Sequence, residues 1–134
     1  HNTIELYIRK GASDTLREEI MQSWYRNQLR ELVSRYVAKL EKKMNVEVSE
    51  IRIRKMKTKW GTCNQRAKRI WLNTELAKKS IESIEYILTH EMVHLLERNH
   101  NKKFVAYMDK FVPNWKHMRD ELNRSALGHV EWKY

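Results

Sequence analysis

The sequence predicts an α+β fold in which a long helix precedes a small antiparallel sheet and further helices follow it. Two patterns support this class. Apolar residues recur every three or four positions over residues 13–44 and 80–98, as in amphipathic helices, whereas they alternate with polar residues over residues 46–57. The 134 residues fit a single domain, 1–134, which is large enough to bury a core without disulfide bonds.

The first predicted elements are a short strand and a long helix. Residues 4–8 alternate apolar and polar side chains, and Gly11 ends this strand. Ser13 or Asp14 can cap a helix that continues to about Met44. The apolar face of this helix consists of residues at three- and four-residue spacing: Leu16, Ile20, Trp24, Leu29, Leu32, Val33, Tyr36, Val37 and Leu40.

The predicted sheet follows this helix. Residues 46–57 indicate a strand whose alternation changes phase at Glu50, where we expect a turn or bulge. Residues 60–64 have the composition of a turn. Residues 69–73 then form the return strand of an antiparallel pair.

Three helices are predicted in the second half of the chain. A second helical segment follows His100 and ends at about Phe111, because Pro113 cannot continue it. The last helix covers residues 114–126. The first of the three, over residues 80–98, has a core stripe made by Ile81, Ile84, Ile87, Leu88, Met92 and Leu95.

The first of these helices contains the spacing H-E-x-x-H, formed by His90, Glu91 and His94. Residues four positions apart lie one turn apart on the same face of a helix, so both imidazoles can reach one metal ion. Glu91 lies about 100° around the helix, where its carboxylate can reach a water bound to that ion. Composition alone produces this spacing with a probability of about 3%. The motif therefore indicates a hydrolytic metal site.

A zinc ion at such a site needs a third protein ligand and leaves a fourth position for water. His100 is the natural third ligand. We expect Asn99 to adopt a left-handed conformation that ends the helix and turns His100 toward the ion. Glu121 is the first alternative ligand. A residue that stabilises the oxyanion cannot be assigned from the sequence, and three side chains qualify: Tyr107, His117 and Arg66.

Residues 51–69 contain eight basic side chains and no acidic one, within a chain of net charge +10. Alternation places Arg52 and Arg54 on one face, in solvent, and Ile51 and Ile53 on the other, packed in the core. Such a segment is most often a solvated face, but it can also attract an acidic peptide or make weak contact with nucleic acid. Trp60 can border a substrate cleft, although a core position is the preferred interpretation.

The remaining composition limits the class of protein. Cys63 is the single cysteine, which excludes an intrachain disulfide and fits the reducing cytoplasm, where we expect the protein. Cys63 is predicted to be a buried or half-buried thiol and not a catalytic nucleophile, because the sequence shows no histidine paired with it. No apolar run approaches the roughly 20 residues that cross a bilayer, so we expect no membrane association.

Two segments of the sequence resemble the YgjP-like metallopeptidase-domain family. One consists of residues 90–95 together with Asn99-His100-Asn101 and Phe104. The other is Trp60-Gly61-Thr62-Cys63, followed by residues 70–73, which is similar to the W-G-S-C turn and return strand of that family. Thr62 stands where the family usually has serine. The resemblance covers residues 15–125 and extends, more distantly, to SprT/Spartan-like and Wss-type proteases.

This resemblance implies a zincin-like fold with a small antiparallel sheet over the active-site helix. It implies His90, His94 and His100 as zinc ligands and Glu91 as the catalytic base. The expected protein is thus a zinc metallopeptidase that hydrolyses peptide or protein substrates through a metal-activated water.

Two other functions are compatible with the sequence. A protease recruited to DNA would use the basic residues 51–69, as the Spartan-like relatives suggest. A non-catalytic module with a structural metal is less favoured, because structural zinc sites normally have four protein ligands and only three have suitable spacing here.

Overall fold

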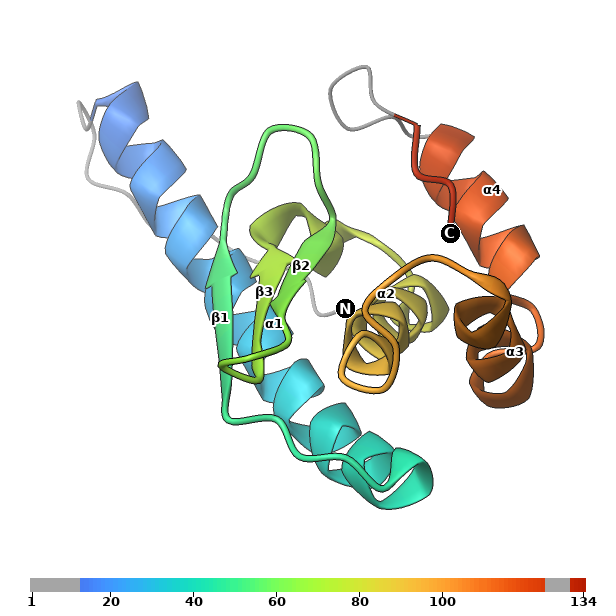
Figure 1. The fold of residues 1–134 in the computed structure, drawn as a ribbon. Coiled ribbons are helices and arrows are strands. Elements are labelled where there is room, and N and C mark those ends of the chain that lie inside the picture. The colour runs from blue at the N-terminus through green and yellow to red at the C-terminus, as the bar shows by residue number, and fades with distance from the viewer. Residues whose placement is uncertain (1–12, 125–130) are drawn as a thin grey trace.

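The computed structural model describes residues 13–124 and 131–134, so the strand predicted over residues 4–8 lies outside the described residues. The elements follow the order of one long helix, three strands, a short 3₁₀ helix and three further helices (Figure 1). This order confirms the α+β class. Among the described residues, no helix is both long and apolar enough to cross a membrane.

The long helix α1 spans Asp14–Met44, as predicted. The Ser13 hydroxyl caps it by accepting a hydrogen bond from the Leu16 amide, and Asn45 ends it in a left-handed conformation with φ of 56°. The predicted apolar face is only partly correct, because Leu16 and Ile20 are 44% and 37% exposed. The buried residues belong to the second half of the helix: Leu29, Val33, Leu40 and Met44.

The sheet consists of β1 (Glu50–Arg54), β2 (Gly61–Asn64) and β3 (Arg69–Asn73), in the spatial order β1-β3-β2. Two predictions are wrong here. The strand β1 pairs with β3 in parallel, not antiparallel, and residues 61–64 form a strand, not a turn. The chain crosses from β1 to the opposite edge of the sheet as β2, and an antiparallel hairpin then returns it to the centre as β3.

The turn of this hairpin lies at residues 65–68, after β2. The Asn64 side chain accepts a hydrogen bond from the Ala67 amide at 3.0 Å, and Lys68 has a positive φ of 53°. In β1, Arg52 and Arg54 are exposed, whereas Ile53 is buried and Ile51 is partly buried against the core, which confirms the predicted alternation. The change of phase near Glu50 marks the start of the strand.

Helix α2 (Ile81–Val93) follows the 3₁₀ helix η1 (Thr74–Lys78), and the Ser80 hydroxyl caps it by accepting from the Ser83 amide. It ends at Val93, well before the predicted end near Arg98.

Helices α3 (Lys102–Phe111) and α4 (Trp115–Arg124) pack against α2. Figure 1 shows α2 between the sheet and the α3–α4 pair, with α1 behind the sheet. Neighbours on all these sides bury α2 almost completely, including the residues of the H-E-x-x-H motif that lie within the helix.

Candidate metal centre and active site

The last turn of α2 positions two of the predicted ligands. His90 lies within the helix, and His94 directly follows it with helical backbone angles of −63° and −15°. The spacing of one turn is therefore kept although the helix ends at Val93. The two imidazole rings lie 5.1 Å apart, centre to centre.

The turn after α2 brings His100 to the same place. The Val93 carbonyl oxygen accepts hydrogen bonds from the amides of both Leu96 and Glu97 at 2.8 Å, which tightens the chain after the helix. The expected left-handed Asn99 is wrong, since the positive φ angles of non-glycine residues in the described ranges belong to Asn45 and Lys68. His100 nevertheless reaches the cluster, with its Nε2 atom 3.1 Å from that of His94.

The three imidazoles offer ring nitrogens that all lie within 4.8 Å of one another. Burial, followed by the charges of His94 and His100, lowers the pKa of His90 to about 3. Burial also lowers the pKa of His94 and that of His100. The three rings are thus neutral near pH 7, the form in which imidazole binds a metal ion.

Main-chain carbonyls fix the orientation of two of these rings. The Nδ1 atom of His90 lies 3.1 Å from the carbonyl oxygen of Tyr134, and that of His94 lies 3.2 Å from the carbonyl oxygen of Glu97. Because a carbonyl oxygen only accepts, both Nδ1 atoms carry the proton and both Nε2 atoms keep a lone pair. This is the tautomer that a histidine ligand needs when it binds through Nε2.

The Glu91 side chain is buried beside these nitrogens, with a relative exposure of 2%. Burial raises the pKa of Glu91 to about 8, against the opposing effect of the Lys59 charge. The Oε2 atom lies 3.9 Å from Nε2 of His90, but both pKa shifts favour neutral forms, so this contact is not an ion pair. The same Oε2 atom has no hydrogen-bond partner among the described residues.

A divalent cation fits these residues. Three neutral imidazoles converge, and a buried carboxylate oxygen beside them has no partner within the described part of the chain. A buried polar atom without a partner is costly and indicates a group that binds there. Three nitrogen ligands with an adjacent carboxylate make a donor set suited to zinc and open enough for catalysis.

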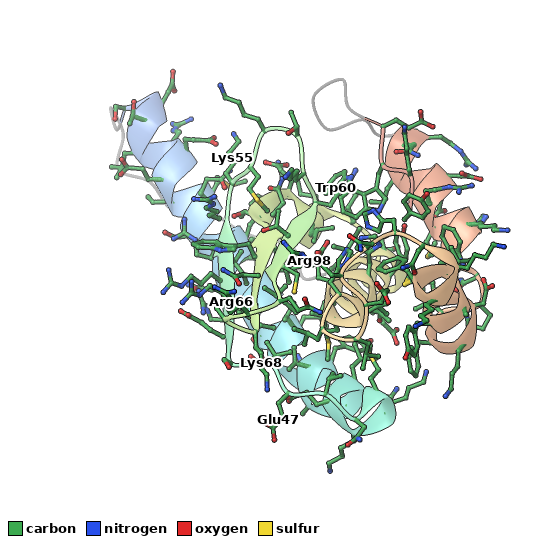
Figure 2. The ribbon with its side chains drawn as sticks, in the orientation of Figure 1. Glu47, Lys55, Trp60, Arg66, Lys68 and Arg98 are labelled. Atoms are coloured by element: carbon green, nitrogen blue, oxygen red, sulfur yellow. The ribbon has the colours of Figure 1, made fainter. Side chains whose placement is uncertain are left out.

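A cleft of about 1050 Å³ opens onto the histidines and Glu91. The strand β2 lines one side of it, where a side chain at Gly61 would meet Cγ of Glu91 at 3.0 Å. Three cations also line the cleft and form what we call the basic rim: Lys59, Arg66 and Arg98. Figure 2 labels Arg66 near the β2–β3 turn and Arg98 after α2. The exposed rim residues form no ion pair with other described residues.

Known proteins resemble this chain over most of its length. The family model described as "YgjP-like, metallopeptidase domain" matches residues 1–125. The chain belongs to this family. No curated protein sequence matches the chain.

Two solved structures share the fold of this YgjP-like domain. The metallopeptidase zymogen of Pyrococcus abyssi abylysin has a TM-score of 0.63 at 20% identity, over 76% of this chain and 98% of its own. The metallopeptidase zymogen of Methanocaldococcus jannaschii jannalysin has a TM-score of 0.57 at 20% identity, over 72% and 95%. Both agree with the predicted zincin-like fold.

The structure of the YgjP-like domain separates the candidates for an oxyanion helper. His117 points into solvent from α4, where it lies 3.9 Å from Glu121, so neither residue lines the cleft. Tyr107 stacks on Phe111 and is also absent from the cleft lining. Arg66 is the one of the three candidates that lines the cleft.

Two other predictions of side-chain environment are resolved. Trp60 is 4% exposed and belongs to the core, which agrees with the preferred interpretation. Cys63 is half-buried beside the cleft, and burial raises the pKa of its thiol to about 12. The neutral thiol is a poor nucleophile, so nothing in its environment supports a catalytic cysteine.

Two residues at the end of the chain, Trp132 and Tyr134, contact the histidine cluster and were not predicted from the sequence. The Trp132 ring lies 4.8 Å from the His90 ring, and the Tyr134 ring stacks on His100 at 4.5 Å. These contacts join residues far apart in the sequence. The periodicity of neighbouring residues cannot predict such contacts. The one hint in the sequence is that two aromatic residues, Trp132 and Tyr134, alternate with charged residues at its end.

Proposed function

We propose that this chain is a zinc-dependent peptidase whose single catalytic domain uses His90, His94 and His100 as metal ligands and Glu91 as general base. One observation carries the proposal: a buried Glu91 oxygen with no hydrogen-bond partner in the described part of the chain lies beside a cluster of three neutral imidazoles, and all four side chains line an open cleft. Membership of a metallopeptidase family supports the same assignment.

A zinc ion held by these residues would supply a Lewis acid that polarises the scissile carbonyl and makes water easier to deprotonate. Burial raises the pKa of Glu91 to about 8 in the metal-free site, and the charge of a bound cation would lower it and favour the ionised form. The ionised Glu91 takes the proton from the attacking water and passes it to the leaving amine. The neighbouring Gly61 leaves the Glu91 carboxylate room to approach the substrate, because a larger residue would contact it. Arg66 is the side chain that we propose for stabilising the oxyanion, since it lines the cleft and carries a permanent charge.

The position of β2 supports an extended peptide as substrate. This strand is at one edge of the sheet and pairs only with β3 among the described strands. Its outer edge lines the cleft, so its main-chain groups can pair with a substrate backbone. The basic rim favours substrates with acidic side chains near the scissile bond.

Recruitment to DNA through residues 51–69 is a weaker second proposal. The rim cations support it, but Arg52 and Arg69 bind the Glu50 carboxylate, and Arg54 lies over the Trp71 ring at 4.4 Å. These three side chains are therefore partly neutralised or occupied within the sheet. Binding of labelled duplex at two salt concentrations tests the proposal, with an expected log–log slope of about −0.9 per phosphate contact. Absence of binding at low salt would reject it.

Metal removal and reconstitution test the main proposal. The purified protein should hold about one zinc per chain by elemental analysis, because the site supplies one set of three nitrogen ligands. Hydrolysis of a fluorogenic peptide library should stop when a chelator removes the metal and return when zinc is restored. Stoichiometric zinc without hydrolysis of any peptide would instead support a non-catalytic metal-binding module.

A further inference from the structure

The C-terminal segment, residues 131–134, returns alongside α4 toward α2 (Figure 1). Side chains from two helices anchor it. The Asn123 amide of α4 binds both main-chain groups of Trp132, accepting from its N–H at 2.9 Å and donating to its carbonyl at 2.8 Å. The Trp132 indole N–H donates to the Tyr86 hydroxyl of α2 at 3.0 Å. Tyr86 is completely buried and lies one turn before His90, so this anchor connects the segment to the core.

Three contacts join the anchored segment to the histidine cluster. The Tyr134 carbonyl accepts from Nδ1 of His90 at 3.1 Å, and the Trp132 ring packs 4.8 Å from the His90 ring. The Tyr134 ring stacks on His100 at 4.5 Å, with an angle of 16° between the rings. Two of the three candidate ligands are thus held by residues more than thirty positions away in the sequence.

The Tyr134 carbonyl binds the ring nitrogen of His90 that is farther from Glu91. The carbonyl binds Nδ1 and leaves Nε2, the nitrogen 3.9 Å from Glu91, without its proton. His94 obtains the same support from Glu97, only three residues away. The difference matters, because His94 carries its own support within the local turn, whereas His90 depends on the C-terminal segment being in place.

We propose that Asn123, Tyr86, Trp132 and Tyr134 form a positioning strap that holds His90 and His100 in the orientation needed to bind a divalent cation. The inference rests on the proposed metal ligands. None of the four residues needs to touch the substrate for this role, and the strap acts through the rings of His90 and His100. Loss of hydrogen bonds and packing behind metal ligands typically lowers metal affinity about 10–100-fold.

Zinc affinity of the full chain, measured by competition with a chromophoric chelator, tests the strap. Trp132→Ala should raise the zinc dissociation constant by about 10–100-fold. Trp132→Phe keeps a ring against His90 and should recover part of this loss. Tyr86→Phe and Trp132→Phe each remove the same hydrogen bond, between the Trp132 indole and the Tyr86 hydroxyl. The double variant should therefore bind zinc no more weakly than the single variant that has the lower zinc affinity. His117→Ala, on the exposed face of α4, is the control and should bind as wild type does.

The unfolding temperature of the metal-free variants separates positioning from folding. The strap predicts that zinc affinity falls in Tyr86→Phe and Asn123→Ala while the metal-free proteins still unfold cooperatively. Wild-type zinc affinity in Trp132→Ala would overturn the inference. Faster hydrolysis by this variant at unchanged zinc affinity would also overturn it, because the segment would then block access to the cleft instead of positioning the ligands. Failure of the wild-type protein to bind zinc would instead refute the proposed function.

Discussion

The two sides of the cleft differ in how their side chains are held. On the α2 side, His90 and Glu91 are each 2% exposed and lie within a helix that has neighbours all around it. Elsewhere around the cleft, the basic rim is exposed and has no ion-pair partner among the described residues. Buried groups have shifted pKa values and fixed geometry, whereas exposed charges are mobile and screened by salt. We therefore assign metal binding and proton transfer to the α2 side, and substrate attraction to Lys59 and Arg98 of the rim.

The largest effect is expected from removing the candidate ligands. His90→Ala and His94→Ala should each lose most of the bound zinc and nearly all hydrolysis, because two imidazoles rarely retain the ion. Elemental analysis of the purified variants measures this directly. His117→Ala is again the matched control.

The third ligand can be tested separately in the same way. His100→Ala should also lower the zinc content, although His100 is more exposed than His90. Full zinc retention in His100→Ala would remove it from the ligand set. Glu121 would then need testing as the alternative, although it lies on α4 with His117.

A smaller effect is expected where β2 approaches Glu91. In Gly61→Ala the added carbon would lie 3.0 Å from Cγ and 3.1 Å from Oε2 of Glu91, so the carboxylate must shift. Displacement of a catalytic group by about 1 Å can lower the rate about 10²-fold. We expect kcat to fall by about 10–100-fold while zinc content stays near wild type. An unchanged kcat would show that Glu91 does not need its observed position.

The stability of the metal-free protein should depend on pH through Glu91. Its pKa rises from an ordinary value of 4.5 to about 8 on folding, so folding favours the protonated acid. Glu91 ionises at lower pH in the unfolded chain than in the folded one, so the contribution of Glu91 to stability falls between pH 4.5 and pH 8. The loss should amount to a few kcal/mol at pH 8.

Glu91→Gln cannot ionise and should lack this decline. The unfolding free energy of Glu91→Gln, minus that of the metal-free wild type, should increase as pH rises from 5 to 8. Chemical denaturation of both proteins at these two pH values measures the difference. A constant difference across this range would show that burial does not perturb Glu91.

The smallest effect is expected from the rim. Arg98→Gln should lower kcat/KM for an acidic peptide by about 2–5-fold at low salt, since exposed charges contribute up to about 1 kcal/mol. High salt should reduce the effect. Arg35→Gln, an exposed position on α1 outside the cleft lining, is the control. Arg66→Gln should differ from Arg98→Gln, because loss of an oxyanion-stabilising group typically lowers kcat by about 10²–10³-fold. A loss of only 2–5-fold in Arg66→Gln would restrict that residue to substrate attraction.

The sequence predicted the α2 side well because its determinants are local. The His90 and His94 spacing follows from helix geometry alone, and His100 needs only a tight turn after the helix. The turn did not form through Asn99, however. Its backbone is instead held by the Val93 carbonyl, which accepts two hydrogen bonds, and no residue type specifies that arrangement.

The sheet and the C-terminal segment were harder to predict because their partners are distant. Alternation in β1 shows which side chains face the core but not which strand lies beside it, so the parallel pairing with β3 was missed. The strand β2 has four residues, including Gly61 and Asn64, too few to show a period. Trp132 and Tyr134 contact a helix more than thirty residues earlier in the chain.

The Glu91→Gln variant tests the central claim most directly when zinc content and hydrolysis are measured on the same preparation. Glutamine keeps the size of the side chain but cannot accept the proton from water. The account predicts about one zinc per chain, as in wild type, and hydrolysis lower by roughly 10²–10⁴. Unchanged hydrolysis would contradict the role of Glu91 as base, and loss of zinc together with activity would make it part of the metal site instead.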